Sequence, residues 1–148
     1  MAMTMNGEVQ LAASREAVWT KLNDPEVLKV CIPGCEELEK TEDNGFRATA
    51  KMKVGPVSAR FKGKVMLSDL DPPNGYRITG EGEGGVAGFA KGGATVGLAD
   101  KDGGTLLSYN VEAQIGGKLA QLGQRLINGA AKKLADEFFV NFAKAVQG

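Results

Sequence analysis

Acidic side chains are the first residues in this sequence that could do chemistry. Glu81, Glu83 and Glu112 could be combined into a general acid–base pair. The 148 residues contain no histidine, so there is no Ser-His-Asp or Cys-His arrangement and no imidazole to bind a metal. With no such group beside them, we interpret the three carboxylates as solvated surface groups. We therefore expect no catalytic residue and no metal site.

Cysteine and glycine also suggest chemistry that their spacing does not support. Cys31 and Cys35 are four positions apart, which fits neither a redox Cys-x-x-Cys pair nor half of a zinc site, so we expect reduced thiols. Ten glycines fall within residues 80–104. A phosphate-binding loop would be followed by a helix or end in Gly-Lys-Ser/Thr, and neither occurs here. We therefore predict no nucleotide site and no tightly bound cofactor.

The glycine-rich segment leaves two interpretations of the interior open. Glycine lets strands coil sharply and lets a helix approach a sheet closely. Missing side chains can equally leave an apolar slot between sheet and helix. Alternation predicts which residues point inward, but it does not show that the inside is hollow. The predicted wall of this slot consists of Phe46, Phe61, Val65, Phe89, Leu107, Tyr109, Leu122 and Leu126.

Basic side chains gather on one predicted hairpin although the chain carries 18 basic and 18 acidic residues and no net charge. Such a row is usually a solvated sheet face. The alternative is a docking patch for an acidic protein or an anionic lipid surface, where each basic residue contributes about 1 kcal/mol. No aromatic residue is interleaved on that face, so we expect no nucleic-acid partner. The patch consists of Lys51, Lys53, Arg60, Lys62 and Lys64.

The elements that position these residues begin with a strand and two short helices. Residues 3–11 mix apolar and polar side chains in rough alternation, which predicts a half-buried strand. Ser14 is the expected N-cap of a helix over residues 15–22. Asp24-Pro25 caps and starts a second helix, which ends before residues 32–34.

From residue 36 to residue 114 the hydrophobic period is two. Residues 46–54 and 57–67 predict a hairpin that turns at Gly55-Pro56 and has one dry and one wet face. A turn cluster at residues 71–75 precedes another strand, and a last strand covers residues 107–115. No parallel crossover is implied, so we predict an antiparallel meander.

The end of the sequence predicts a long amphipathic helix that needs a surface to pack on. Its apolar stripe recurs every three or four positions over about seven or eight turns. The antiparallel sheet is the one surface of matching length that the sequence offers, so we predict a single α+β domain over residues 1–148. The stripe consists of Leu119, Leu122, Leu126, Ala130, Leu134, Phe138 and Phe142.

Targeting signals are not evident in the sequence. The first seven residues lack a basic region followed by an apolar region, so we predict no secretory signal. The longest uncharged stretch, residues 103–111, is far shorter than the ~18 apolar residues of a spanning helix. We expect a cytoplasmic protein.

Several sequence blocks together resemble a known family. They are Asn23-Asp24-Pro25-Glu26, Cys31-Ile32-Pro33-Gly34-Cys35, Gly55-Pro56-Val57, the glycine-rich strand, and Gly116-Gly117-Lys118-Leu119-Ala120-Gln121-Leu122-Gly123. In this order they resemble the CoxG family of carbon monoxide dehydrogenase subunits, which belongs to the START-like (SRPBCC) helix-grip superfamily of polyketide cyclases and lipid-transfer proteins. The resemblance covers nearly the whole chain. The proline-glycine block and the last block are specific, whereas the strand pattern is common to the superfamily.

This resemblance implies a seven-stranded antiparallel sheet wrapped around the C-terminal helix, with two short helices between the first two strands. It also implies an accessory role beside a molybdenum-dependent carbon monoxide dehydrogenase or related hydroxylase, in membrane contact and in handling the lipidic quinone that accepts electrons. Family members often carry a further tail that serves as a membrane anchor, whereas this chain ends at Gly148. We therefore expect transient contact with the inner face of the membrane, or a free carrier.

The leading functional hypothesis is a non-catalytic binder of an isoprenoid quinone or similar lipid. We expect the polar head of this ligand near the mouth of the slot, hydrogen-bonded to Tyr109 or Asn110. One alternative is a small enzyme of the polyketide cyclase or hydratase type, although the inward positions are almost entirely apolar, with Tyr109 the main exception. Another is an assembly factor that docks through the basic hairpin and has a solid core.

Overall fold

The structure, a computed structural model, describes residues 1–147. Seven strands and four α-helices follow one another along these residues, with a short 3-10 turn, η1, before the sixth strand. Their bounds are β1 (Ala2–Leu11), α1 (Arg15–Leu22), α2 (Pro25–Cys31), β2 (Cys35–Lys40), β3 (Gly45–Val54), β4 (Val57–Asp71), β5 (Gly75–Glu83), η1 (Gly85–Ala87), β6 (Phe89–Lys101), β7 (Gly104–Gly116), α3 (Lys118–Gln121) and α4 (Gln124–Gln147).

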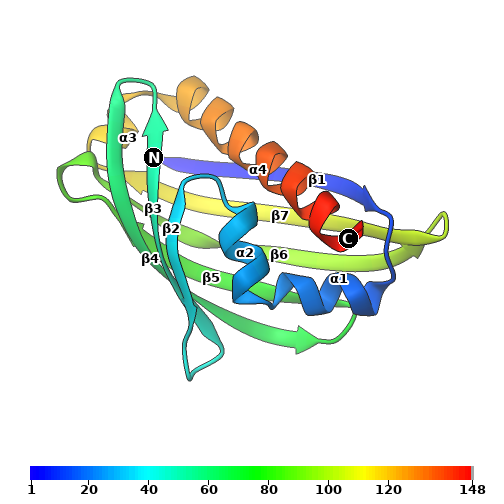
Figure 1. Cartoon of the computed structure of the whole chain (residues 1–148). Helices are drawn as coiled ribbons and strands as arrows, with labels where there is room; N and C mark the ends of the chain where they lie inside the picture. The colour runs from blue at the N-terminus through cyan, green and yellow to red at the C-terminus, as the bar shows by residue number, and fades with distance from the viewer. Residues whose placement is uncertain (148) are drawn as a thin grey trace.

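All seven strands form one antiparallel sheet in the order β1-β7-β6-β5-β4-β3-β2. The first strand therefore pairs with the last one, and β2 forms the other edge. The sheet curves around α4, which lies across its concave face and packs on β1 and β3 (Figure 1). This is the helix-grip fold, and the predicted α+β class and strand count are confirmed.

The two short helices form as the capping residues predict. The side chain of Ser14 accepts a hydrogen bond from the amide of Ala17 at the start of α1. The carboxylate of Asp24 accepts from the amide of Glu26, and Pro25 occupies the first position of α2. Both helices lie between β1 and β2 in sequence and pack against the C-terminal part of α4, so they close one end of the sheet (Figure 1).

The predicted single helix from Leu119 onward is wrong at its start. The chain forms the short helix α3, turns at Gly123, and only then begins α4. Gly123 has a φ of 90°, a conformation that glycine adopts without steric cost and that interrupts a helix. As a result Leu119 is buried, whereas Leu126 is 40% exposed.

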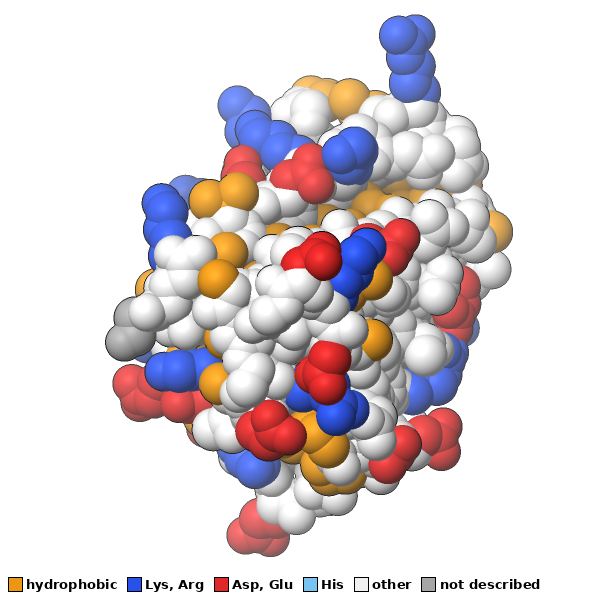
Figure 2. All heavy atoms as spheres, turned by 90° about the vertical axis from the view of Figure 1, so that its right-hand side faces the viewer, with side chains coloured by type: hydrophobic (Ala, Val, Ile, Leu, Met, Phe, Trp, Pro, Cys, Tyr) orange, Lys and Arg blue, Asp and Glu red, His pale blue; other side chains and the backbone are white. Residues whose placement is uncertain are grey.

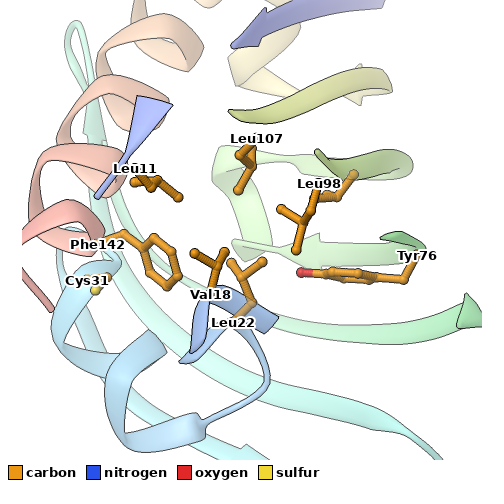
Figure 3. Close-up of a cluster of buried hydrophobic side chains, with 9 residues drawn as sticks. Leu11, Val18, Leu22, Cys31, Tyr76, Leu98, Leu107 and Phe142 are labelled. Carbon is orange, nitrogen blue, oxygen red and sulfur yellow. The ribbon is translucent and has the colours of Figure 1, made fainter. Parts of the chain in front are cut away.

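Two separate apolar clusters fill the space between sheet and helices. The first, which we call the packed end, joins α1, α2 and the C-terminal half of α4 to the sheet (Figure 3). Its buried members are Leu11, Val18, Leu22, Cys31, Tyr76, Val96, Leu98, Leu107 and Phe142. The second cluster lies around α3 and the start of α4, and its buried members are Met3, Ile115, Leu119 and Ile127.

Small residues occupy the inner face of the sheet between the two clusters. Across neighbouring strands Ala48 pairs with Gly63 and Gly63 with Gly82, while Gly80 pairs with Gly92. These residues together with Ala94 form what we call the small-residue belt; none of them belongs to either cluster. Each remains partly or fully exposed although the strands on both sides are paired. The centre of the inner face therefore carries little side-chain volume of its own.

Glycine is required at two belt positions because neighbouring strands approach closely. A Cβ added at Gly92 would collide with the carbonyl oxygen of Glu112, and one added at Gly80 would lie 2.6 Å from the carbonyl oxygen of Lys64. The atoms nearest to either added Cβ belong to neighbouring strands and not to α4. These glycines therefore serve the sharp coiling of the strands, and they do not serve a close approach of the long helix.

Candidate functional site

Two grooves run along the two flanks of α4 and are the candidate entrances to the interior. The β1 groove lies between α4 and β1 and has a volume of about 690 Å³. The β3 groove lies between α4 and β3 and has a volume of about 730 Å³. Both volumes fall within the ~300–1,000 Å³ that is usual for small-molecule sites. Each groove has apolar walls with charged residues of α4 beside them.

The β1 groove combines an aromatic wall with one hydroxyl and one ion pair. The ring of Tyr109 stacks on Phe139 of α4 with 5.2 Å between ring centres. Its hydroxyl occupies the space that a side chain at Gly7 would need. Lys132 forms an ion pair with Asp136 at 2.9 Å. The hydrogen bond and charge of Asp136 raise the pKa of Lys132, and Tyr109 adds to this effect.

The β3 groove is apolar at its base and basic at its edge. Met52 and Val54 of β3 face Leu122, Leu126 and other residues of the C-terminal helices across it. The basic edge consists of Lys51, Lys53, Arg125 and Lys133. Lys133 lies 4.0 Å from Glu137 on the same helix. This groove therefore offers an apolar surface with a cationic border.

The structure distributes the predicted slot residues over several places. Phe46 and Val65 are paired neighbours on the inner face, and Phe61 packs at the edge of the second cluster with Leu122. Leu107 is fully buried in the packed end. Tyr109 lines the β1 groove, whereas Leu122 and Leu126 line the β3 groove. These seven side chains surround the concave side of the sheet, but no single groove contains them all.

Phe89 is a correction to the predicted wall. Ala90 pairs with Ile115 and packs on the inner face, so the preceding residue, Phe89, points to the outer face. Its ring covers Gly116, and the residue is 41% exposed. Asn110, predicted as a partner for a polar ligand head, also lies exposed on the outer face, next in sequence to the inward Tyr109. Neither residue reaches the interior.

Tyr76 is the interior residue that the sequence analysis missed. It belongs to the packed end, is only 6% exposed, and meets the edge of Trp19 of α1 at 5.3 Å between ring centres. Val96 pairs with Tyr76 on one side and with Tyr109 on the other, so the two tyrosines flank one row of the inner face. The alternation of Tyr76 and Ile78 with the charged Arg77 indicates that Tyr76 points inward.

The basic hairpin is more neutral than its sequence suggests. Arg60 donates to Glu36 at 2.8 Å, and Lys64 lies 3.5 Å from Asp43. The hydrogen bond from Arg60 lowers the pKa of Glu36. Within residues 1–147, Lys51, Lys53 and Lys62 form no ion pair. Figure 2 shows basic and acidic side chains interspersed on another face, the end of the molecule that it presents.

Metal binding, thiol chemistry and membrane crossing have little support in the part of the chain that the structure describes. There, no three His, Cys, Asp or Glu residues are grouped so that they could hold a metal ion. Cys31 and Cys35 are free, and burial raises the pKa of both thiols, which disfavours the reactive thiolate. Over the same residues, no helix has the length and apolar character that a bilayer crossing requires.

Comparison with protein families and solved structures found one matching family and similar solved structures. The family model for the carbon monoxide dehydrogenase subunit CoxG matches residues 7–147. A conserved protein from Geobacillus kaustophilus has 34% sequence identity and a TM-score of 0.92, covering 98% of this chain and 95% of its own. The comparison with curated proteins gave no match.

More distant structures share the fold alone. The structure described as Ara h 8.0201 superposes with a TM-score of 0.68 at 16% identity, and 99% of each chain is covered. The Zhui aromatase/cyclase from Streptomyces sp. R1128 has a TM-score of 0.67 at 12% identity, covering 99% of this chain and 94% of its own. The helix-grip fold is therefore shared by proteins whose sequences have little in common.

Proposed function

Because this chain belongs to the CoxG family of carbon monoxide dehydrogenase subunits, we propose that it is a non-catalytic accessory protein for a carbon monoxide dehydrogenase-type molybdenum hydroxylase. Its task in this proposal is to bind an apolar small molecule and to present it to the enzyme. The family match over residues 7–147 supports the accessory role. The helix-grip fold supports the small-molecule role, because its curved sheet and long helix leave a groove on each flank of the helix.

The proposed cargo is an isoprenoid quinone or a similar lipid, held between α4 and the small-residue belt. The observation that carries this proposal is the belt itself, which lies between two packed clusters and is left partly exposed. Burying each methylene of an apolar tail there would contribute about 0.8 kcal/mol. The β1 and β3 grooves supply the routes of access on either side of the helix.

A titration with a matched pair of variants tests the cargo site. Ala94 lies on the inner face between Ile78 and Val111, whereas Ala99 of the same strand is exposed on the outer face. We expect a short-chain ubiquinone analogue to quench Trp19 fluorescence in the unmodified protein and in Ala99→Phe. In Ala94→Phe the added ring fills the space above the belt, so quenching should be lost.

Extraction of the purified protein with organic solvent, followed by mass spectrometry, gives an independent test. The proposal expects a copurified isoprenoid lipid in the unmodified protein and a depleted one in Ala94→Phe. If extraction yields no lipid and the quinone analogue produces no quenching, the proposal of an apolar cargo fails.

The proposed partner contact uses the part of the basic hairpin that is free of ion pairs. Lys51, Lys53 and Lys62 remain available for acidic groups of an enzyme or for the inner face of a membrane, whereas Arg60 and Lys64 are engaged with Glu36 and Asp43. Lys62 lines neither groove, so Lys62→Glu should weaken copurification with the hydroxylase and leave quinone binding unchanged. Equal copurification would contradict this docking surface.

A small enzyme of the cyclase type is the second candidate function. It is favoured by the Tyr109 hydroxyl, which shares the β1 groove with the Lys132–Asp136 ion pair and influences the pKa of Lys132. A tyrosine beside a cation can transfer a proton to a carbonyl substrate. Turnover of an aromatic polyketide precursor that disappears in Tyr109→Phe would favour this candidate over the carrier.

A further inference from the structure

The hydroxyl of Tyr76 has no protein partner although its residue is buried. Tyr76 is 6% exposed, and its side chain forms no hydrogen bond with the described residues. Figure 3 shows its oxygen pointing toward the other labelled side chains of the packed end, with Leu98 and Leu22 nearby. A buried tyrosine hydroxyl normally has a hydrogen-bond partner, because an unpaired one costs about 1–3 kcal/mol.

The surroundings of this oxygen must therefore contain open space. Among residues 1–147, no fully enclosed side-chain nitrogen or oxygen lacks a hydrogen-bond partner. The Tyr76 oxygen lacks a partner in the protein, so it is not fully enclosed. A solvent-accessible space thus reaches a hydroxyl whose residue belongs to the same apolar cluster as Val18, Leu22 and Leu98.

The strand register places Tyr76 close to the small-residue belt. On β5, Tyr76 is followed on the inner face by Ile78, which pairs with Ala94 of the belt. Tyr76 therefore lies at the border between the packed end and the small-residue belt. On the other side of Val96, about two strand spacings of ~4.8 Å away, Tyr109 reaches the β1 groove.

We propose that the Tyr76 hydroxyl is the inner anchor of the cargo site and donates a hydrogen bond to a carbonyl oxygen of the bound molecule. The polar head then enters first and comes to rest against the packed end, while the apolar tail lies along the belt toward the grooves. This orientation is opposite to the sequence-based expectation of a head at the mouth beside Tyr109. The inference rests on the proposed cargo function.

The chemistry of the group agrees with a donor role. Burial raises the pKa of Tyr76, so the phenol keeps its proton at all physiological pH values. A carbonyl oxygen can accept this proton in a hydrogen bond, whereas a pure hydrocarbon cannot. The site should therefore distinguish a quinone from an isoprenoid hydrocarbon of similar size.

Two single-oxygen deletions test the anchor by isothermal titration calorimetry. Tyr76→Phe and Tyr109→Phe each remove one hydroxyl and keep the ring. With a short-chain ubiquinone analogue we expect the Kd to rise about 3- to 10-fold in Tyr76→Phe, as for loss of one hydrogen bond, and less than 2-fold in Tyr109→Phe. With squalene, which has no oxygen, both variants should bind like the unmodified protein.

The outcomes separate the anchor from the cargo function. If the unmodified protein binds neither the quinone analogue nor squalene, the cargo function itself fails. If it binds the quinone and Tyr76→Phe binds it equally well, the anchor is overturned while the cargo function stands. A loss confined to Tyr109→Phe would place the head at the mouth and would also overturn the anchor.

Thermal unfolding without ligand excludes a purely structural role. Because the hydroxyl has no protein partner, Tyr76→Phe should unfold at the same temperature as the unmodified protein or at a higher one. A Tm that falls by several degrees would show that the oxygen is already used within the protein, and it would contradict the proposal.

Discussion

The packed end and the small-residue belt lie on the same inner face of the sheet but differ in the size of their side chains. In the packed end, large side chains from α1, α2, α4 and the sheet enclose one another, and Leu11, Val18, Cys31 and Phe142 have no exposed surface. In the belt, glycine and alanine leave the sheet partly exposed. The difference shows that one fold can be filled by large side chains at one end and carry few of them in the middle.

Under the proposed function, stability and binding are assigned to different residues. Dense packing contributes most of the hydrophobic stabilisation, and a large side chain removed from it leaves a cavity. A region with few side chains contributes little stabilisation, so it can be filled by a ligand without disrupting the fold. Four predictions test this division.

Truncation in the packed end should have the largest effect. Phe142 is fully buried and stacks on Phe138, so Phe142→Ala should lower the free energy of unfolding by about 3–5 kcal/mol. Val140 on the same helix is 56% exposed, and Val140→Ala should change it by less than about 0.5 kcal/mol. Urea denaturation measures both values. Similar losses in the two variants would contradict the division.

A single methyl group in the belt should have the next largest effect. Gly92→Ala places a Cβ against the carbonyl oxygen of Glu112, so we expect a loss of about 1–3 kcal/mol. Gly97 of the same strand has nothing within 4 Å of an added Cβ, and Gly97→Ala should be neutral or stabilise by about 0.4–1 kcal/mol. Thermal unfolding compares the stability of the Gly92→Ala and Gly97→Ala variants. A tolerated Gly92→Ala would show that strand coiling does not depend on this glycine.

Added volume beyond the Cβ should be tolerated at Ala94 of the belt and rejected in the packed end. Val18→Phe inserts a ring among fully buried neighbours and should cost about 1–3 kcal/mol. Ala94→Phe inserts one where the inner face carries little side-chain volume, and we expect a change below about 1 kcal/mol. Chemical denaturation of both variants measures these changes in the free energy of unfolding. A large loss in Ala94→Phe would mean that the interior is already filled.

The outer face should give the smallest effect, because its charges are solvated. Arg60 lowers the pKa of Glu36 below its ordinary value of 4.5, so the ion pair stabilises the fold above that pH and its contribution disappears as the pH falls through the lowered pKa. Arg60→Gln should therefore be slightly less stable than the unmodified protein at pH 7, and this difference should shrink as the pH falls below 4.5. A difference that grows toward low pH would contradict this sign.

Periodicity and capping residues were sufficient to predict most of the fold. Alternation defined the strands, and Ser14 and Asp24 marked the starts of α1 and α2 where the structure has them. The break at Gly123 was missed because Leu122 and Leu126 continue the helical spacing across it. Spacing alone does not indicate which glycine adopts a positive φ.

The candidate site was harder to predict because it depends on register and on unfilled space. Phe89 was placed on the wrong face because the glycines around it carry no side chains that would define the alternation. Tyr76 was missed because the lack of a hydrogen-bond partner for its hydroxyl is visible only when every neighbour is in place. The two grooves arise from the position of α4 over a curved sheet, which no local pattern encodes.

The pairing of the first strand with the last one has a consequence for synthesis. The amino group of Met1 donates to the carbonyl of Ile115, 114 positions away, and β1 has no other strand beside it. Contacts between such distant residues form slowly, because a long loop must close first. A ribosome must therefore release the chain through the end of β7 before β1 can dock, and until then the apolar inner surface of the nascent sheet remains available to chaperones.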